Sequence, residues 1–90
     1  IKFTFIMNNK EILKKKIIYR SKHRGSKEMD LLLGSFVDKY INSFDISDLN
    51  DLVLLLLVED QEIYDWYFSK SKKSPIRKSN VSILLKKFKL

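Results

Sequence analysis

The stretch SKEMDLLLGSFVDKYI, residues 26–41, carries the strongest periodic signal in this 90-residue chain. Its apolar residues recur at intervals of three and four, which places them on one face of a helix. They are Met29, Leu32, Leu33, Phe36, Val37, Tyr40 and Ile41. Gly25 precedes the stretch and interrupts the helical pattern. The sequence therefore predicts a helix that begins near Ser26 and buries this face.

A helix is also predicted before this stretch. The chain has two Gly and one Pro, which are too few turn signals for an all-β protein. Asn8 is followed three positions later by Glu11, a capping arrangement for a helix start. Leu13 and Ile17 then follow at helical spacing, and the pattern ends at about Lys22.

Three more helices are predicted after it. Ser47 is expected to cap the third, Asp60 a short fourth and Asn80 the last. Their inward residues are predicted to be Leu49, Leu52, Val53, Leu56 and Leu57; Ile63, Trp66 and Tyr67; and Val81, Leu84, Leu85 and Phe88. Because residues 52–58 are all apolar, a buried strand remains an alternative there. Their leucine-rich composition favours a helix, and a helix that is apolar on all sides is a central one.

These patterns predict an all-α fold, a compact antiparallel bundle of about five short helices in a single domain. Residues 1–7 are expected to be an N-terminal extension, with Met7 as a candidate start, and residues 8–69 the helical domain. Residues 70–90 are expected to be a basic C-terminal tail with a last helix. An exposed connection over residues 69–75 would precede that helix, which could pack on the bundle, lie on a partner or fray.

Charge is distributed unevenly along the chain. Residues 1–24 carry eight Lys/Arg and one acid, residues 25–69 carry two and ten, and residues 70–90 carry eight and none, for a net charge of +7. Such a chain can neutralise charge internally or offer opposite faces to one large partner, with ordinary solvated surface as the alternative. With no Cys, a disulfide framework and a thiolate metal cluster are excluded. The apolar run 52–58 is too short for a bilayer, so no membrane insertion is predicted.

The sequence offers little for catalysis. His23 is the single imidazole and stands between Lys22 and Arg24, without a neighbouring carboxylate to orient it. There is no glycine-rich phosphate loop, no HExxH and no ligand-spaced acidic loop. We therefore predict that the chain is not an enzyme, has no catalytic residue and holds no metal; a small enzyme is the least favoured hypothesis.

The segment between the first two predicted helices has a composition suited to binding. Gly25 stands at a helix start, with Arg24 before it and Glu28 and Asp30 in the first turn. Acidic residues near a helix N-terminus are favoured by the helix dipole, and a glycine lets a partner's backbone come close. A capped helix with a glycine turn and no binding role is the alternative.

Two blocks of sequence resemble a known family, the succinate dehydrogenase assembly factors that promote flavinylation, whose bacterial members are called SdhE. RSKHRGSKEMDLLLGSF, residues 20–36, resembles the family's R-x-x-x-R-G-M-x-E-x-D-x-x-L-G-x-F signature. LLLVEDQEIYDW, residues 55–66, is similar to the family's L-L-E-x-x-D-x-x-L-Y-D-W. The blocks occur in the family's order and at the expected separation. The resemblance covers about residues 8–69 and implies a compact bundle of about five helices.

The resemblance also implies a partner-binding site. The family's R-G-x-x-E element contacts a flavoprotein subunit near its flavin, which implies this role for Arg24, Gly25 and Glu28. Asp30 is expected to support them. The predicted partner-binding set is completed by Arg20 and His23 from the same segment. Ser26 departs from the family, which usually has Met there, and this loses an apolar contact.

The function implied by the resemblance is assembly without catalysis. The factor would bind the flavoprotein subunit of succinate dehydrogenase, with that of fumarate reductase as a further candidate, and promote covalent attachment of FAD. FAD would belong to the partner, and this chain would hold no cofactor stably. The expected location is the cytoplasm of a bacterium, or the mitochondrial matrix if the source is a eukaryote.

A small basic helical nucleic-acid-binding module is the main alternative. The run of lysines at residues 14–16 and the basic tail suggest it, because a phosphate-binding surface needs clustered cations. The acidic central segment and the lack of a helix with base-reading residues argue against it, so no nucleic-acid partner is expected.

Overall fold

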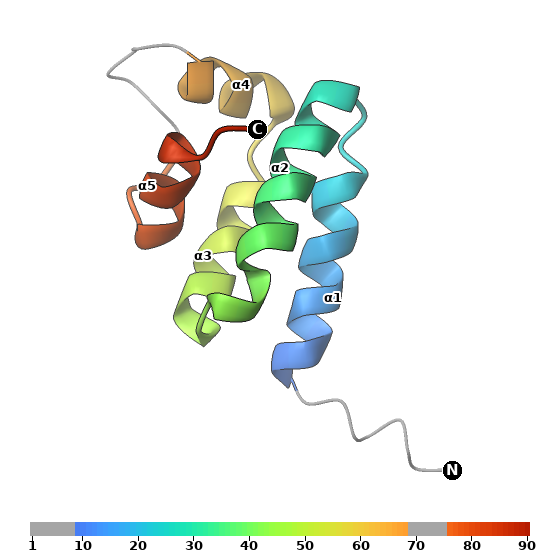
Figure 1. Cartoon of the computed structure of the whole chain (residues 1–90), viewed down its shortest axis with the longest axis vertical. Coiled ribbons are helices and arrows are strands. Elements are labelled where there is room, and N and C mark those ends of the chain that lie inside the picture. Colours follow the sequence, from blue (N-terminus) through green and yellow to red (C-terminus); the bar gives the residue numbers. More distant parts are fainter. Residues whose placement is uncertain (1–8, 69–75) are drawn as a thin grey trace.

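The computed structural model describes residues 9–68 and 76–90, which form five α-helices and one 3₁₀ turn (Figure 1). The elements are α1 (Asn9–Lys22), α2 (Lys27–Tyr40), the 3₁₀ turn (Ile41–Ser43), α3 (Ile46–Leu56), α4 (Asp60–Phe68) and α5 (Asn80–Lys87). The predicted all-α fold is confirmed, and residues 52–58 form the end of α3 and the turn after it rather than a strand. The predictions for residues 1–7, for Asn8 as a cap and for the connection 69–75 lie outside the described residues.

The first three helices run side by side in alternating directions. α1 packs on α2 and on α3, and α5 packs on α3. The α1–α2 corner and the α3–α4 turn lie at the same end of the bundle, and α4 crosses that end (Figure 1). Two segments that are more than thirty residues apart in sequence are thereby brought together, as the hydrogen bond between Arg24 and Asp60 shows.

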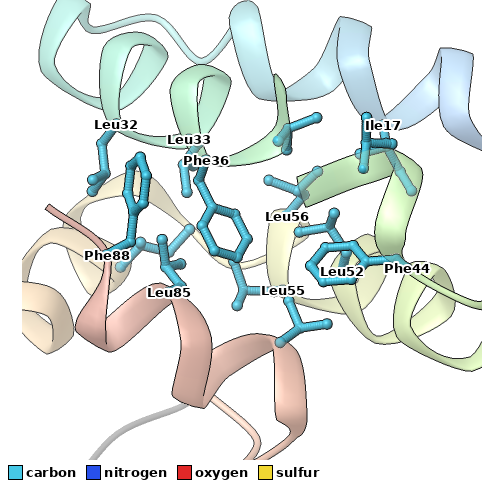
Figure 2. Packing of buried hydrophobic residues seen from close by; sticks show 14 of the residues in the cluster. Ile17, Leu32, Leu33, Phe36, Phe44, Leu52, Leu55, Leu56, Leu85 and Phe88 are labelled. Atoms are coloured by element: carbon cyan, nitrogen blue, oxygen red, sulfur yellow. The ribbon is translucent and has the colours of Figure 1, made fainter. Parts of the chain in front are cut away.

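The predicted apolar face of α2 forms the middle of the core. Its buried residues are Met29, Leu32, Leu33, Phe36 and Val37, with Ile41 directly after the helix. Figure 2 shows the ring of Phe36 pointing from α2 toward Leu55 of α3 and Leu85 of α5. Full burial of a side chain of this size contributes about 1.5–3 kcal/mol. Packing of this one face therefore accounts for much of the stability of a small core.

Helix α5 is part of the same core. Val81, Leu85 and Phe88 are buried, and the Phe88 ring lies 5.5 Å from that of Phe36 in an edge-on arrangement. The hydroxyl of Tyr67, on α4, donates a hydrogen bond to the carbonyl oxygen of Phe88. Of the three alternatives for the last helix, the structure shows packing on the bundle.

A small residue permits the close approach of α1 and α2. Gly34 is buried in the middle of α2, and a Cβ there would lie 3.2 Å from Cγ of Lys22. Ser21, which is also fully buried, satisfies its hydroxyl by donating to the carbonyl oxygen of Ile18 at 2.9 Å. Near the corner, a glycine of α2 therefore lets the end of α1 come close, and the large apolar residues of both helices pack in the shared core.

Two predicted helix caps are wrong by one or two residues. The N-cap of α3 is Asp45 and not Ser47: Asp45 accepts from the backbone N–H of Asp48 in a capping box. The N-cap of α5 is Ser79 and not Asn80, again in a capping box. An N-cap needs extended backbone angles together with a side chain that reaches the third helical residue. Several neighbouring residues had suitable side chains, and the backbone path selected among them.

The prediction that the third helix is apolar and buried on all sides is also wrong. Leu57, which was predicted to face inward, follows the last residue of α3 and is 64% exposed, and Leu54 is exposed as well. The helices packed on α3 cover its buried residues Leu49, Leu52, Leu55 and Leu56 and leave this other side open among the described residues. Asp60 is likewise not an N-cap, because the first hydrogen bond of α4 is accepted by the carbonyl oxygen of Glu59.

Trp66 and Tyr67 of α4 are half-buried against the core, as is Tyr40 of α2. None of the helices in the two described ranges is both long enough and apolar enough to span a bilayer.

Candidate functional site

The corner between α1 and α2 is exposed at its glycine. Gly25 has a φ of 99°, a conformation that residues with a Cβ rarely adopt. A Cβ placed on Gly25 would meet no atom of the described residues within 4 Å, apart from those of its two chain neighbours. The backbone conformation therefore favours glycine, while the space outside it is open to another molecule.

Arg24, next to this glycine, directs its side chain into the molecule. Its Nε donates to Oδ1 of Asp60 at 2.7 Å, its Nη2 donates to the carbonyl oxygen of Val58 at 2.7 Å, and its Nη1 donates to that of Leu56. The side chain is 10% exposed. The planar guanidinium thus binds the α3–α4 turn through three acceptors, a geometry that suits Arg and not Lys. This contact ties the α1–α2 corner to the opposite turn.

The first turn of α2 fixes the backbone of the corner. Oδ1 of Asp30 accepts from the backbone N–H of Arg24 at 2.6 Å. Ser26 is the N-cap, as its position at the predicted helix start suggested, and its Oγ accepts from the N–H of Met29 at 3.2 Å. Ser26 therefore has a polar role at the site where the family usually has Met.

Glu28 stands on the outside of the same turn. It is exposed, and within the described residues no ion pair includes it. Its side chain borders a shallow hollow between the starts of α2 and α4. The residues around that hollow are Ser26, Glu28, Met29, Asp60, Gln61 and Tyr64. The carboxylate is therefore held at a surface hollow together with the partly exposed ring of Tyr64.

A second hollow lies on the other side of Asp60. It is lined by His23, Arg24, Glu59 and Asp60. His23 donates from Nδ1 to the carbonyl oxygen of Tyr19 at 2.8 Å, and the two rings stack with centroids 4.1 Å apart. Because a carbonyl oxygen can only accept, Nδ1 of His23 carries the proton in this bond.

The six predicted partner-binding residues thus divide into two groups. Four are exposed: Arg20, His23, Gly25 and Glu28. Arg24 and Asp30 are half-buried, and the contacts of their side chains described above are within the chain. A partner-binding role for each remains a prediction. The sequence-based set lacked Asp60 and Tyr64, although both belong to the second quoted block, whose position beside the first could have indicated them.

The described parts of the chain contain no group of three His, Cys, Asp or Glu side chains that could hold a metal ion. The corner presents open backbone at Gly25, the exposed carboxylate of Glu28 and the exposed ring of Tyr64 beside it. Fold and site together define a small all-helical protein with an exposed glycine corner between its first two helices.

Comparison with known proteins identifies the family. The family described as "Flavinator of succinate dehydrogenase" matches residues 15–89 of this chain. The chain belongs to that family, which confirms the resemblance seen in its sequence. The match extends past residue 69, where the quoted resemblance ends, and includes α5.

The names of curated relatives agree with this family assignment. "Succinate dehydrogenase assembly factor 2, mitochondrial" of Dictyostelium discoideum is 45% identical over 62 residues, which are 69% of this chain and 44% of the relative. The protein of the same name in Saccharomyces cerevisiae is 38% identical over 79 residues, 84% of this chain and 49% of the relative. "FAD assembly factor SdhE" of Acetobacter pasteurianus is 32% identical over 57 residues, 63% and 52% of the two chains.

The chain spans about half the length, or less, of the curated relatives it matches. No solved structure gives a significant match.

Proposed function

We propose that this chain is an assembly factor that docks on the flavoprotein subunit of succinate dehydrogenase and promotes covalent attachment of FAD to it. The family membership supports this function, and the names of the relatives agree with it. The observation that carries it is the corner itself. Gly25 is exposed with open space around it, and Glu28 is exposed without an ion pair to any described residue.

In this proposal the chain contributes binding energy and no reacting atom. The covalent bond forms between the partner's own histidine and its FAD. The factor accelerates this step by binding the reactive conformation of the flavoprotein more tightly than other conformations. A tenfold preference shifts the conformational equilibrium by about 1.4 kcal/mol, and moving a population from 1:99 to 99:1 needs a preference of about 10⁴-fold.

In this proposal the residues of the corner have different roles in binding the partner. Gly25 allows the partner's backbone to come close, because no side chain projects there. Glu28 offers a carboxylate to donors of the partner. Arg24 and Asp30 hold the corner in shape from within, through the three-acceptor contact and the bond to the backbone N–H. Binding to a corner held rigid in advance costs less conformational entropy than binding to a flexible one.

FAD belongs to the partner in this proposal. The chain has two glycines, Gly25 and Gly34, so its sequence contains no glycine-rich loop of the kind that cradles a dinucleotide pyrophosphate. The chain is accordingly proposed to be non-catalytic and to hold no cofactor stably. The flavoprotein of fumarate reductase is a further candidate partner. The proposed locations are the mitochondrial matrix, in line with the relatives named mitochondrial, or the cytoplasm of a bacterium.

The nucleic-acid-binding alternative receives no support from the family match.

The test is co-expression with the flavoprotein subunit, with covalent flavin read as fluorescence in a denaturing gel. Gly25→Arg and Gly25→Ala are the matched pair, because both place a Cβ at the same φ of 99° and share its strain. They differ in the bulk that projects outward. We expect Gly25→Arg to abolish the stimulation of flavinylation and Gly25→Ala to retain a substantial part of it.

Equal fluorescence with wild type and with Gly25→Arg would refute the role of the corner. Equal loss in both variants, with both folded by circular dichroism, would assign the effect to backbone strain instead of docking.

A further inference from the structure

Among the residues that the structure describes, no helix packs on the outward side of α1. α1 packs on α2 and α3, and its remaining surface faces away from them (Figure 1). Five exposed residues at helical spacing are here called the outer face of α1: Ile12, Lys16, Tyr19 and Arg20 of the helix and His23 directly after it. They follow one another at intervals of one turn or less over about 16 Å of helix. Tyr19 is 63% exposed, so the described residues leave this face uncovered.

The charge of this face is unbalanced. The acid of α1 is Glu11, near its start, and Lys14 lies 3.9 Å from it. Lys22, at the other end, pairs with Asp38 of α2 at 3.1 Å. In residues 9–68 and 76–90, no ion pair includes Lys16 or Arg20. Two cations one turn apart thus face outward beside an exposed aromatic ring.

The outer face of α1 is continuous with the docking corner. His23, its last residue, lines the hollow that also contains Glu59 and Asp60. Asp60 in turn lines the hollow that contains Glu28. The surface therefore changes from positive to negative where α1 meets the corner.

The change in surface charge from positive to negative favours one kind of partner over others. A nucleic acid or an anionic bilayer covering both regions would be repelled by Glu28 and Glu59. A protein surface can present acids to Lys16 and Arg20 and a base to Glu28. Exposed Tyr and Arg side chains are also the types enriched in protein interfaces. The mixed charge therefore favours a protein over a polyanion.

We propose that the outer face of α1 is a second contact with the flavoprotein that the corner binds, and that it docks on an acidic patch of that protein. The inference rests on the proposed function and extends it. Lys16 and Arg20 provide electrostatic attraction and orientation, Ile12 and Tyr19 provide apolar contact, and the corner provides the close approach. Charges of this kind act mainly on the association rate and on its dependence on salt.

The experiment measures binding of the full chain to the purified flavoprotein subunit at about 50 mM and about 500 mM salt, ionic strengths at which screening differs strongly. The test variant is Lys16→Glu/Arg20→Glu. The matched control is Lys78→Glu/Lys87→Glu, which makes the same change of net charge at exposed residues on and before α5. We expect the test variant to bind at least tenfold more weakly at low salt, with a smaller difference at high salt. The control should stay within about threefold of wild type.

Two further arms identify the source of the negative charge: vesicles containing anionic lipid, and a short DNA duplex. Circular dichroism confirms that every variant is folded. If the test variant binds the flavoprotein as tightly as the control does, the inference is overturned while the proposed function stands. Loss of vesicle or DNA binding in the test variant, with flavoprotein binding unchanged, would also overturn it. A wild-type chain that fails to bind the flavoprotein at all would overturn the proposed function first, and this inference with it.

Discussion

Replacing Asp60 by Asn should destabilise the protein by about 2 kcal/mol. Asp60 accepts from Nε of Arg24 at 2.7 Å, and the two side chains are 26% and 10% exposed. Asn keeps an oxygen that can accept from Nε, so the substitution removes the negative charge of the ion pair. An ion pair is worth about 0.2–1 kcal/mol at an exposed site, and breaking a buried one costs about 3–5 kcal/mol, which places this partly buried pair at about 1.5 kcal/mol. Asp60 is also the first residue of α4, where a negative charge interacts favourably with the helix dipole by about 0.5 kcal/mol.

The assay is urea-induced unfolding followed by circular dichroism and by the fluorescence of Trp66, the single tryptophan. In thermal unfolding, the same loss of about 2 kcal/mol in the free energy of unfolding would appear as a fall in melting temperature of roughly 10 °C for a domain of this size. Asp38→Asn is the matched control. It removes a carboxylate 3.1 Å from Lys22 in a pair whose side chains are 44% and 55% exposed, so its cost should stay below about 0.5 kcal/mol.

A double-mutant cycle separates the two contributions that Asp60 makes to stability, through Arg24 and through the helix dipole. When Arg24→Gln is already present, Asp60→Asn can lose only the dipole interaction, about 0.5 kcal/mol. The coupling between the two residues should therefore be about 1.5 kcal/mol. If Asp60→Asn has the same cost in both backgrounds, or a cost no larger than that of Asp38→Asn, the idea that Arg24 and Asp60 hold the corner together is refuted.

Two other substitution pairs test the packing and the caps by the same unfolding assay. Phe36→Ala should lower the free energy of unfolding by about 3–5 kcal/mol, because Phe36 is fully buried in the centre of the core. Phe68→Ala, which removes an exposed side chain, should lower it by less than about 1 kcal/mol. Similar losses in the two variants would contradict the assigned core. Ser79→Ala should lower the free energy of unfolding by about 1 kcal/mol, because it removes the capping box, and Asn80→Ala should change it by less than about 0.5 kcal/mol. The reverse order would show that Asn80 is the cap.

Local sequence was sufficient to predict the five helices and the position of the corner between the first two. The apolar periodicity of residues 29–41 predicted the face of α2 that is buried, because a helix brings residues three and four apart onto one side. Gly25 predicted the break between α1 and α2, and its φ of 99° gives the physical reason. Both properties depend on residues within one or two turns of each other.

Only the tertiary structure decided which corner residues face outward. Arg24 and Glu28 look equally suited to bind a partner when read along the chain, yet Arg24 meets Asp60, which is 36 positions away, and Glu28 stays exposed. Leu57 is likewise exposed, although its neighbours are buried. Local spacing cannot encode such outcomes, because they depend on which distant segment the folded chain brings alongside.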